Sequence, residues 1–318
     1  MSDQHSDRVP PALAGERREI RLAGVGRVSW YQDRPVAAAT GRPLLLIHSV
    51  NAAASAYEVK TLYDRYRGQR PVYAIDLPGY GFSDRSDRSY TPRLMCDAIR
   101  GVLDVILRDN STLTVDAVAL SLSCEFLARV AVECPDSLAT VALVSPTGFN
   151  RRVLREGVQG SNLGMARVLS VLNAPLYRRG LFGLLTRRAV IRYFLQRTWG
   201  SRSIDEGMLD YDYLTTRPPG AEFAPLHFLS GYLFSADSGT VYRALTQPVW
   251  VVHGIRGDFV NYRGLDTFTG QTNWTVAVLP TGALPHFELP NEFASRYDAW
   301  LRSTGLTANP DPASPGRP

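Results

Sequence analysis

The chain has 318 residues, of which 45% are hydrophobic and 20% charged, and its formal net charge is +5. This length can bury a large core, either as one α/β domain or as two smaller units. No apolar run reaches the roughly 18–20 residues that span a bilayer, which argues against a membrane-spanning protein.

The N-terminal segment and the cysteines bear on where the protein works. Residues 1–18 are polar and lack the apolar core of a signal peptide, so export is not indicated. The three cysteines are odd in number and show no metal-ligand spacing, which favours reduced thiols. We therefore expect a cytoplasmic protein that binds no metal and needs no cofactor.

Short apolar runs alternate with helical patterns along the first half of the chain. Strands are predicted, in chain order, at residues 19–22, 28–31, 44–47, 71–75, 115–120, 140–144, 248–252 and 274–279. Helices are predicted at residues 54–66, 92–107, 122–133 and 291–302. This alternation indicates right-handed crossovers and a mostly parallel, doubly wound sheet of the α/β class.

The pattern changes between the sixth and seventh predicted strands. Residues 149–245 show helical periodicity, breaks at Gly and Pro, and no obvious strand. We expect an α/β core over 18–148 and 246–303 with this segment inserted as a helical cap. The ends, 1–17 and 304–318, are predicted to be a disordered lead and a disordered tail.

Arginine is concentrated in the predicted cap. Residues 149–203 carry eleven Arg and a single acid, Glu156, which gives the segment a charge of about +10. Six of them are predicted to form a basic face: Arg178, Arg179, Arg187, Arg188, Arg192 and Arg197. A solvated surface is the simplest interpretation; the alternatives are peripheral contact with anionic lipid and contact with an anionic group of a substrate. The chain has no recognised nucleic-acid-reading motif, so nucleic acid is not an expected partner.

The most informative motif surrounds Ser121. An apolar run ends there and a helical pattern follows, with the small residues Ala119 and Ser123 two positions before and after the serine. This is the layout of a nucleophile elbow, a tight strand–turn–helix in which the two backbones nearly touch. Glycine usually fills the two flanking positions. The motif predicts Ser121 as a nucleophile, and a serine hydroxyl needs a base to take its proton.

Four segments in this order resemble the α/β-hydrolase superfamily over residues 18–303. They are Ile47–Asn51, Asp76–Ser83, Ala119–Ser123, and Val252–Gly254 with Arg256–Phe259 and, further on, Pro285–Glu288. The resemblance implies an α/β-hydrolase fold of the capped, serine-nucleophile branch. It does not fix the function, because this fold supports many chemistries.

The resemblance also implies donors for an oxyanion and contacts for a substrate. Acyl transfer needs two preorganised N–H donors, which are implied at the backbones of Leu122 and Val50. Asn51 in the same loop and His227 in the predicted cap are candidate substrate-binding residues.

The implied acid and base depart from the usual pattern. Asp258 is the first carboxylate in the loop after residues 248–252, and it lies one residue further from Gly254 than the acid of many relatives. Relatives usually carry a histidine where this chain has Ala283, and the predicted base, His286, lies three residues on. Residues three apart share a helix face, so His286 is expected to reach the same space.

Three functions stay open from the sequence. The first is a serine hydrolase acting on an ester, thioester or related acyl bond of a small molecule through Ser121, His286 and Asp258. The displaced histidine leaves two alternatives: a non-hydrolytic lyase or cyclase, and a non-catalytic hydrolase-like binding protein. Dehalogenase and epoxide hydrolase activities are disfavoured, because they would need an aspartate at the elbow.

Overall fold

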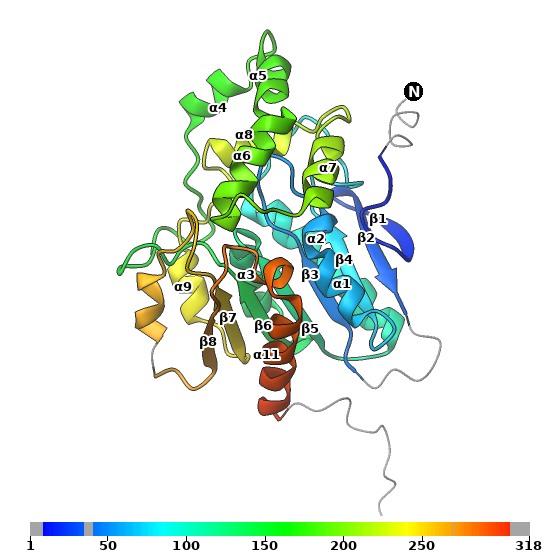
Figure 1. Ribbon diagram of the computed structural model, residues 1–318, viewed down its shortest axis with the longest axis vertical. Coiled ribbons are helices and arrows are strands. Elements are labelled where there is room, and N and C mark those ends of the chain that lie inside the picture. Colours follow the sequence, from blue (N-terminus) through cyan, green and yellow to red (C-terminus); the bar gives the residue numbers. More distant parts are fainter. Residues whose placement is uncertain (1–8, 35–40, 269, 306–318) are drawn as a thin grey trace, which may run out of the picture.

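The computed structural model describes residues 9–34, 41–268 and 270–305. Within them, eight strands form one sheet in the order β1-β2-β4-β3-β5-β6-β7-β8 (Figure 1). The strands are β1 (Glu16–Leu22), β2 (Gly26–Asp33), β3 (Leu44–Ile47), β4 (Val72–Asp76), β5 (Val115–Leu120), β6 (Leu138–Val144), β7 (Val249–His253) and β8 (Trp274–Val278). The β1–β2 and β2–β4 pairs are antiparallel and the others are parallel, which confirms the predicted sheet.

Helices cover both faces of the sheet, so the central strands are buried on both sides. The flanking helices are α1 (Lys60–Tyr66), α2 (Pro92–Asn110), α3 (Ser123–Glu133), α10 (Pro285–Glu288) and α11 (Pro290–Ser303). Successive side chains of a strand point to opposite faces. Accordingly, Leu45 and Ile47 of β3 belong to the core under α2 and α3, whereas Leu44 and Leu46 belong to the core under α1 and α11.

The segment between β6 and β7 is helical, as its sequence predicted. It contains α4 (Ala166–Leu172), α5 (Arg178–Leu185), α6 (Arg188–Trp199), α7 (Glu206–Thr215), α8 (Phe223–Leu229) and α9 (Ser238–Arg243). Helices α4 to α7 stand beyond one end of the sheet, and α9 packs against α3 (Figure 1). None of the described helices is long and apolar enough to cross a membrane.

The N-terminal residues are more ordered than the sequence suggested. Strand β1 begins at Glu16, inside the predicted lead, and Ala12 and Leu13 before it are buried. The Ala12 N–H donates to the Tyr31 hydroxyl at 3.0 Å, which ties this segment to β2. The strand predicted at residues 19–22 therefore begins three residues earlier, at charged and exposed residues that show no strand alternation. The remainder of the predicted lead and residues 306–318 of the predicted tail lie outside the described residues.

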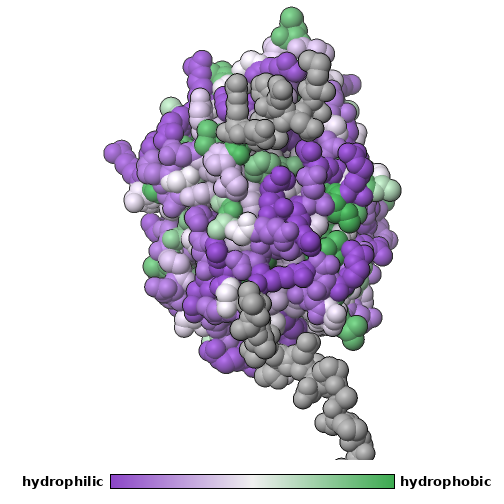
Figure 2. All heavy atoms as spheres, turned by 90° about the vertical axis from the view of Figure 1, so that its right-hand side faces the viewer, coloured by the Kyte–Doolittle hydropathy of each residue, from purple (hydrophilic) through white to green (hydrophobic). Residues whose placement is uncertain are grey.

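Acidic residues neutralise most of the predicted basic face. The ion pairs are Arg178 with Asp87 and Glu222, Arg179 with Glu222, Arg188 with Asp210, Arg192 with Glu206, and Arg197 with Asp258. Among those six arginines, only Arg187 has no acidic partner within the described part of the chain. The face of the molecule nearest β1 is mostly hydrophilic, with apolar residues scattered over it (Figure 2).

Candidate functional site

Ser121 occupies a strained turn between β5 and α3. Its φ of +51° lies in the left-handed region, which costs an L-residue roughly 1–2 kcal/mol. Its N–H donates to the Val144 carbonyl at 2.8 Å, which fixes the turn against β6. The Ser123 hydroxyl donates to the His48 carbonyl at 2.6 Å, so the start of α3 is tied to the loop after β3. Such strain persists only where the surroundings over-determine it, as they do here.

Two backbone donors predicted for the oxyanion remain available. Neither the Leu122 N–H nor the Val50 N–H donates to any acceptor among the described residues. Leu122 is the N-cap of α3, where backbone N–H groups have no partner within the helix. The loop that carries Val50 is held by His48, whose Nε2 accepts the Leu77 N–H at 3.0 Å.

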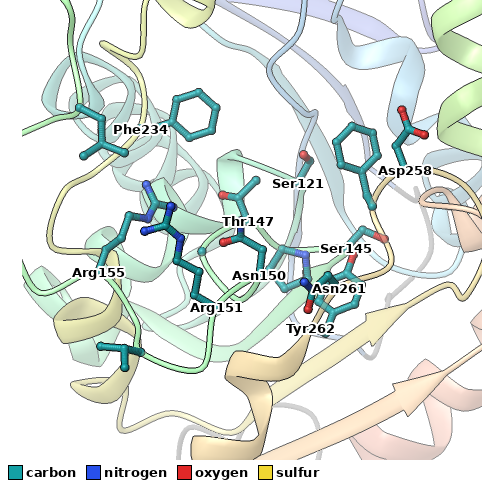
Figure 3. Close-up of a pocket in the computed structure, with 15 residues that line it drawn as sticks. Ser121, Ser145, Thr147, Asn150, Arg151, Arg155, Phe234, Asp258, Asn261 and Tyr262 are labelled. Atoms are coloured by element: carbon teal, nitrogen blue, oxygen red, sulfur yellow. The ribbon is translucent and has the colours of Figure 1, made fainter.

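Ser121 opens onto a pocket of about 650 Å³, a volume in the usual range for small-molecule sites (Figure 3). The pocket lies beside the carboxyl ends of β5 and β6, which is where open α/β sheets bind ligands. Its polar lining consists of Ser121, Ser145, Thr147, Asn150, Arg151, Arg155, Asp258, Asn261 and Tyr262. Figure 3 shows the two arginines on one side of Ser121 and Asp258 on the other.

Asp258, the predicted acid, is a pocket residue whose partner is an arginine. Its Oδ2 forms an ion pair with Arg197 of α6, and its N–H donates to the Arg197 carbonyl at 3.2 Å. Its side chain is 38% exposed. The structure thus places Asp258 in the same pocket as Ser121, while its carboxylate serves the contact with α6.

His286, the predicted base, lies in a different environment. Its Nε2 is 2.8 Å from the Glu58 carbonyl oxygen, and its buried Nδ1 has no partner among the described residues. The ring is fully buried, and this burial lowers the pKa of His286 to about 4, so it is neutral near pH 7. It is not among the residues that line the pocket, and no described histidine is hydrogen-bonded to Ser121.

The end of α6 occupies the space beside the usual histidine position. The Ala283 N–H donates to the Thr198 carbonyl at 2.9 Å, and the Ala283 carbonyl accepts the Ser145 hydroxyl at 2.7 Å. A Cβ on Gly282 would lie 2.4 Å from the Trp199 carbonyl oxygen. The loop after β8 is therefore packed against backbone of the helical insertion.

The two predicted substrate-binding residues are engaged by the protein itself. The Asn51 amide donates to Ser49 at 3.0 Å and to Glu58 at 2.6 Å, and its Oδ1 accepts the Ala53 N–H at 2.7 Å. His227 is 5% exposed, and its Nδ1 lies 2.9 Å from the Phe223 carbonyl oxygen. Neither lines the pocket beside Ser121.

The structure adds pocket residues that the sequence did not single out. Ser145 directly follows β6 and has a φ of +48°, so two neighbouring strands are each followed by a left-handed serine. Tyr262 stacks on His253 with ring centroids 3.9 Å apart. The sequence could have predicted Ser145 as a pocket residue, because it follows a strand parallel to the one before Ser121 and the carboxyl ends of adjacent parallel strands meet at one edge of the sheet. Arg151 and Tyr262 lie in irregular segments that carry no comparable pattern.

This sheet order, with a serine elbow after β5 and a helical insertion after β6, defines the class. The chain belongs to the alpha/beta hydrolase family, whose sequence profile matches residues 44–296. No curated protein matches the sequence. Among the described residues, no group of three or more His, Cys, Asp or Glu side chains is placed to hold a metal ion.

Solved structures similar to this one share its fold at low sequence identity. Cfl2 from Burkholderia cenocepacia has a TM-score of 0.69 and 19% identity, covering 93% of this chain and 99% of its own. A serine hydrolase involved in carbazole degradation has a TM-score of 0.67 and 17% identity, covering 91% and 100%. A thermophilic esterase from Thermogutta terrifontis has a TM-score of 0.66 and 19% identity, covering 91% and 99%.

Proposed function

We propose that the protein is a serine hydrolase that acts on an ester, thioester or related acyl bond of a small molecule. The observation that carries the proposal is Ser121, held at a φ of +51° on the elbow and open to the pocket. Its Oγ attacks the acyl carbon, the bond to the leaving group breaks, and the leaving group departs with a proton. Water then cleaves the acyl-serine ester and restores the hydroxyl.

The negative charge that develops on the carbonyl oxygen needs donors. The free N–H groups of Leu122 and Val50 are the candidates, because neither donates to a described acceptor. The loss of one such donor lowers kcat by about 10²–10³-fold. Backbone N–H groups are fixed by the fold, so they need no reorganisation during the reaction.

A second candidate function follows from the surroundings of the serine hydroxyl. Among the described residues, no histidine is hydrogen-bonded to Ser121, and Asp258 is already paired with Arg197. This favours the alternatives in which the pocket binds a ligand without hydrolysing it, as a lyase or cyclase or as a binding protein. The two candidates differ in whether Ser121 forms a covalent bond.

Turnover of model substrates tests the hydrolase proposal. We expect the purified protein to cleave short-chain 4-nitrophenyl esters or the matching thioesters, and Ser121→Ala to lower kcat by about 10³-fold or more. Ser170→Ala, which changes an exposed serine on α4, is the matched control and keeps wild-type turnover. Equal turnover by wild type and Ser121→Ala would exclude Ser121 as the nucleophile.

His286 is tested separately, because its burial against Glu58 supports packing rather than proton transfer. We expect His286→Gln to keep most of the turnover and to lower the midpoint of thermal unfolding, since the glutamine amide can still donate to the Glu58 carbonyl. A general base contributes about 10²–10⁴-fold. A loss of that size at an unchanged unfolding midpoint would instead assign His286 as the base.

A further inference from the structure

One positive charge in the pocket has no compensating partner among the residues that the structure describes. Two arginines line the pocket, and Arg155 is paired with the buried Glu125. Asp258, the only acidic residue in the lining, is paired with Arg197. The Arg151 guanidinium makes no hydrogen bond or ion pair with any described residue. Because the charges of Arg155 and Asp258 are neutralised by their ion-pair partners, the pocket keeps the single positive charge of Arg151.

Glu125 keeps Arg155 from serving a ligand in the same way. Its carboxylate also accepts the Thr147 hydroxyl at 2.6 Å and the Ser235 N–H at 2.9 Å. Removing one partner from a buried ion pair leaves an uncompensated charge, which is strongly destabilising. Arg155 is therefore held by the fold, while Arg151 is free to bind.

Neighbouring groups make the Arg151 side of the pocket polar. The Asn150 amide has no hydrogen-bond partner among the described residues, and Asn150 and Arg151 are consecutive in the loop after β6. Figure 3 shows Arg151 and Arg155 extending from this loop on the side of Ser121 away from Asp258. Phe234 and Leu163 supply apolar wall in the same pocket. Such a site combines an apolar body with a single anchor for charge.

We propose that the ligand of this pocket carries a carboxylate that binds Arg151, apart from the carbonyl that Ser121 attacks. The proposal rests on the proposed function for the attack and on Arg151 for the carboxylate. A guanidinium presents two parallel N–H groups that match the two oxygens of a carboxylate. A single free guanidinium balances one negative charge, which favours a carboxylate over a doubly charged phosphate. The substrate class is thus an ester or thioester that also bears a free carboxylate.

The neighbouring residue supplies a matched control. Arg151 and Arg152 are both exposed and neither makes a hydrogen bond or ion pair with a described residue, but only Arg151 lines the pocket. If Arg151 were only a solvated surface group, Arg151→Gln and Arg152→Gln would behave alike. If it anchors a carboxylate, only the first substitution weakens binding.

Calorimetric titration tests this without relying on turnover. The proteins are Ser121→Ala, which keeps every pocket charge, and the same variant with Arg151→Gln or Arg152→Gln. The probes are the monocarboxylates benzoate and hexanoate, their neutral amides, and inorganic phosphate. We expect benzoate or hexanoate to bind, Arg151→Gln to weaken that binding about tenfold or more, and Arg152→Gln to leave it unchanged.

Three results would overturn the carboxylate site. In the first, Arg151→Gln does not weaken the binding of the carboxylates. In the second, the amides bind as tightly as the carboxylates. In the third, neither carboxylate binds. If phosphate bound at Arg151 more tightly than either carboxylate, the site would be specific for a different anion and the proposal would be wrong. Because the titration uses a variant without the nucleophile, its failure is separate from a failure of Ser121 to react.

Discussion

At the scale of single residues, the strained backbone at Ser121 is the feature that most distinguishes this site. The serine is held in the left-handed region by the hydrogen bond that its N–H donates to Val144 of β6 and by the start of α3, and Ser145, directly after the adjacent strand, has the same conformation. Both serines are therefore lifted to the edge of the sheet where the pocket lies. A side chain in such a turn stands free of the strand below it.

The strain at Ser121 predicts an order of stability among its variants. Glycine adopts a positive φ without steric cost, whereas alanine keeps the Cβ that makes this conformation unfavourable. We expect Ser121→Gly to exceed Ser121→Ala by about 1 kcal/mol in free energy of unfolding, measured by urea denaturation. If alanine were equally stable, the turn would not be strained by the side chain.

The sequence predicted the tight turn at Ser121 but not the surroundings of His286, for a physical reason. The elbow is local, since its residues lie within one strand–turn–helix and constrain one another through short-range packing. The position of His286 depends on how the loop after β8 packs against α6, a contact between segments that are about 80 residues apart. No sequence pattern in either segment indicates that contact, so the spacing between Ala283 and His286 did not predict where the His286 side chain lies.

At the scale of elements, the end of α6 is docked tightly on the loop after β8. Gly282→Ala would place a methyl group 2.4 Å from the Trp199 carbonyl oxygen, and backbone must move to admit it. We expect this substitution to lower the free energy of unfolding by about 2 kcal/mol. Gly180→Ala in α5 is the control, since nothing lies within 4 Å of its Cβ, and it should be neutral or stabilising. Equal effects would mean that α6 is not packed there.

Helix α7 carries a buried carboxyl that makes stability depend on pH. Burial and the nearby Glu58 and Asp205 raise the pKa of Asp212 well above its ordinary value, and its Oδ1 has no partner among the described residues. Above about pH 4 the unfolded chain releases this proton and the folded protein keeps it. The free energy of unfolding therefore falls as pH rises from about 4 toward the raised pKa.

Asp212→Asn removes that titration while keeping the shape of the side chain. We expect its free energy of unfolding to fall less than that of wild type between pH 5 and pH 8, as measured by denaturant titration at each pH. Asp210→Asn changes an exposed carboxylate on the same helix and should keep the wild-type dependence. A wild-type slope in Asp212→Asn would assign the pH dependence to other groups.

At the scale of the whole molecule, the N-terminal segment joins the sheet to the helical insertion. Leu13 is 4% exposed within the core under α1 and α11, and the Tyr211 hydroxyl of α7 donates to the Pro10 carbonyl at 2.9 Å. We expect Leu13→Ala to cost about 2–3 kcal/mol in free energy of unfolding. Leu176→Ala, at a side chain 95% exposed, should change it by less than about 0.5 kcal/mol. A neutral Leu13→Ala would mean that this segment does not pack as described.

The architecture could be predicted because its strands and helices recur along the sequence as recognisable hydrophobic patterns. Buried parallel strands such as β3 and β4 appear as continuous apolar runs, and the order of the elbow and its flanking loops fixes the family. Only the start of β1 escaped prediction, because exposed edge strands carry charged residues in place of an alternating pattern. The pocket residues after β6 and β7 come from irregular loops, where sequence patterns carry least information.

Covalent labelling shows whether Ser121 is a nucleophile. The protein is incubated with a fluorophosphonate probe, and the modified peptide is located by mass spectrometry in wild type and in Ser121→Ala. We expect one adduct on the peptide that contains Ser121 in wild type and none in the variant. An unmodified wild type, or the same adduct in Ser121→Ala, would contradict a nucleophilic serine at the elbow.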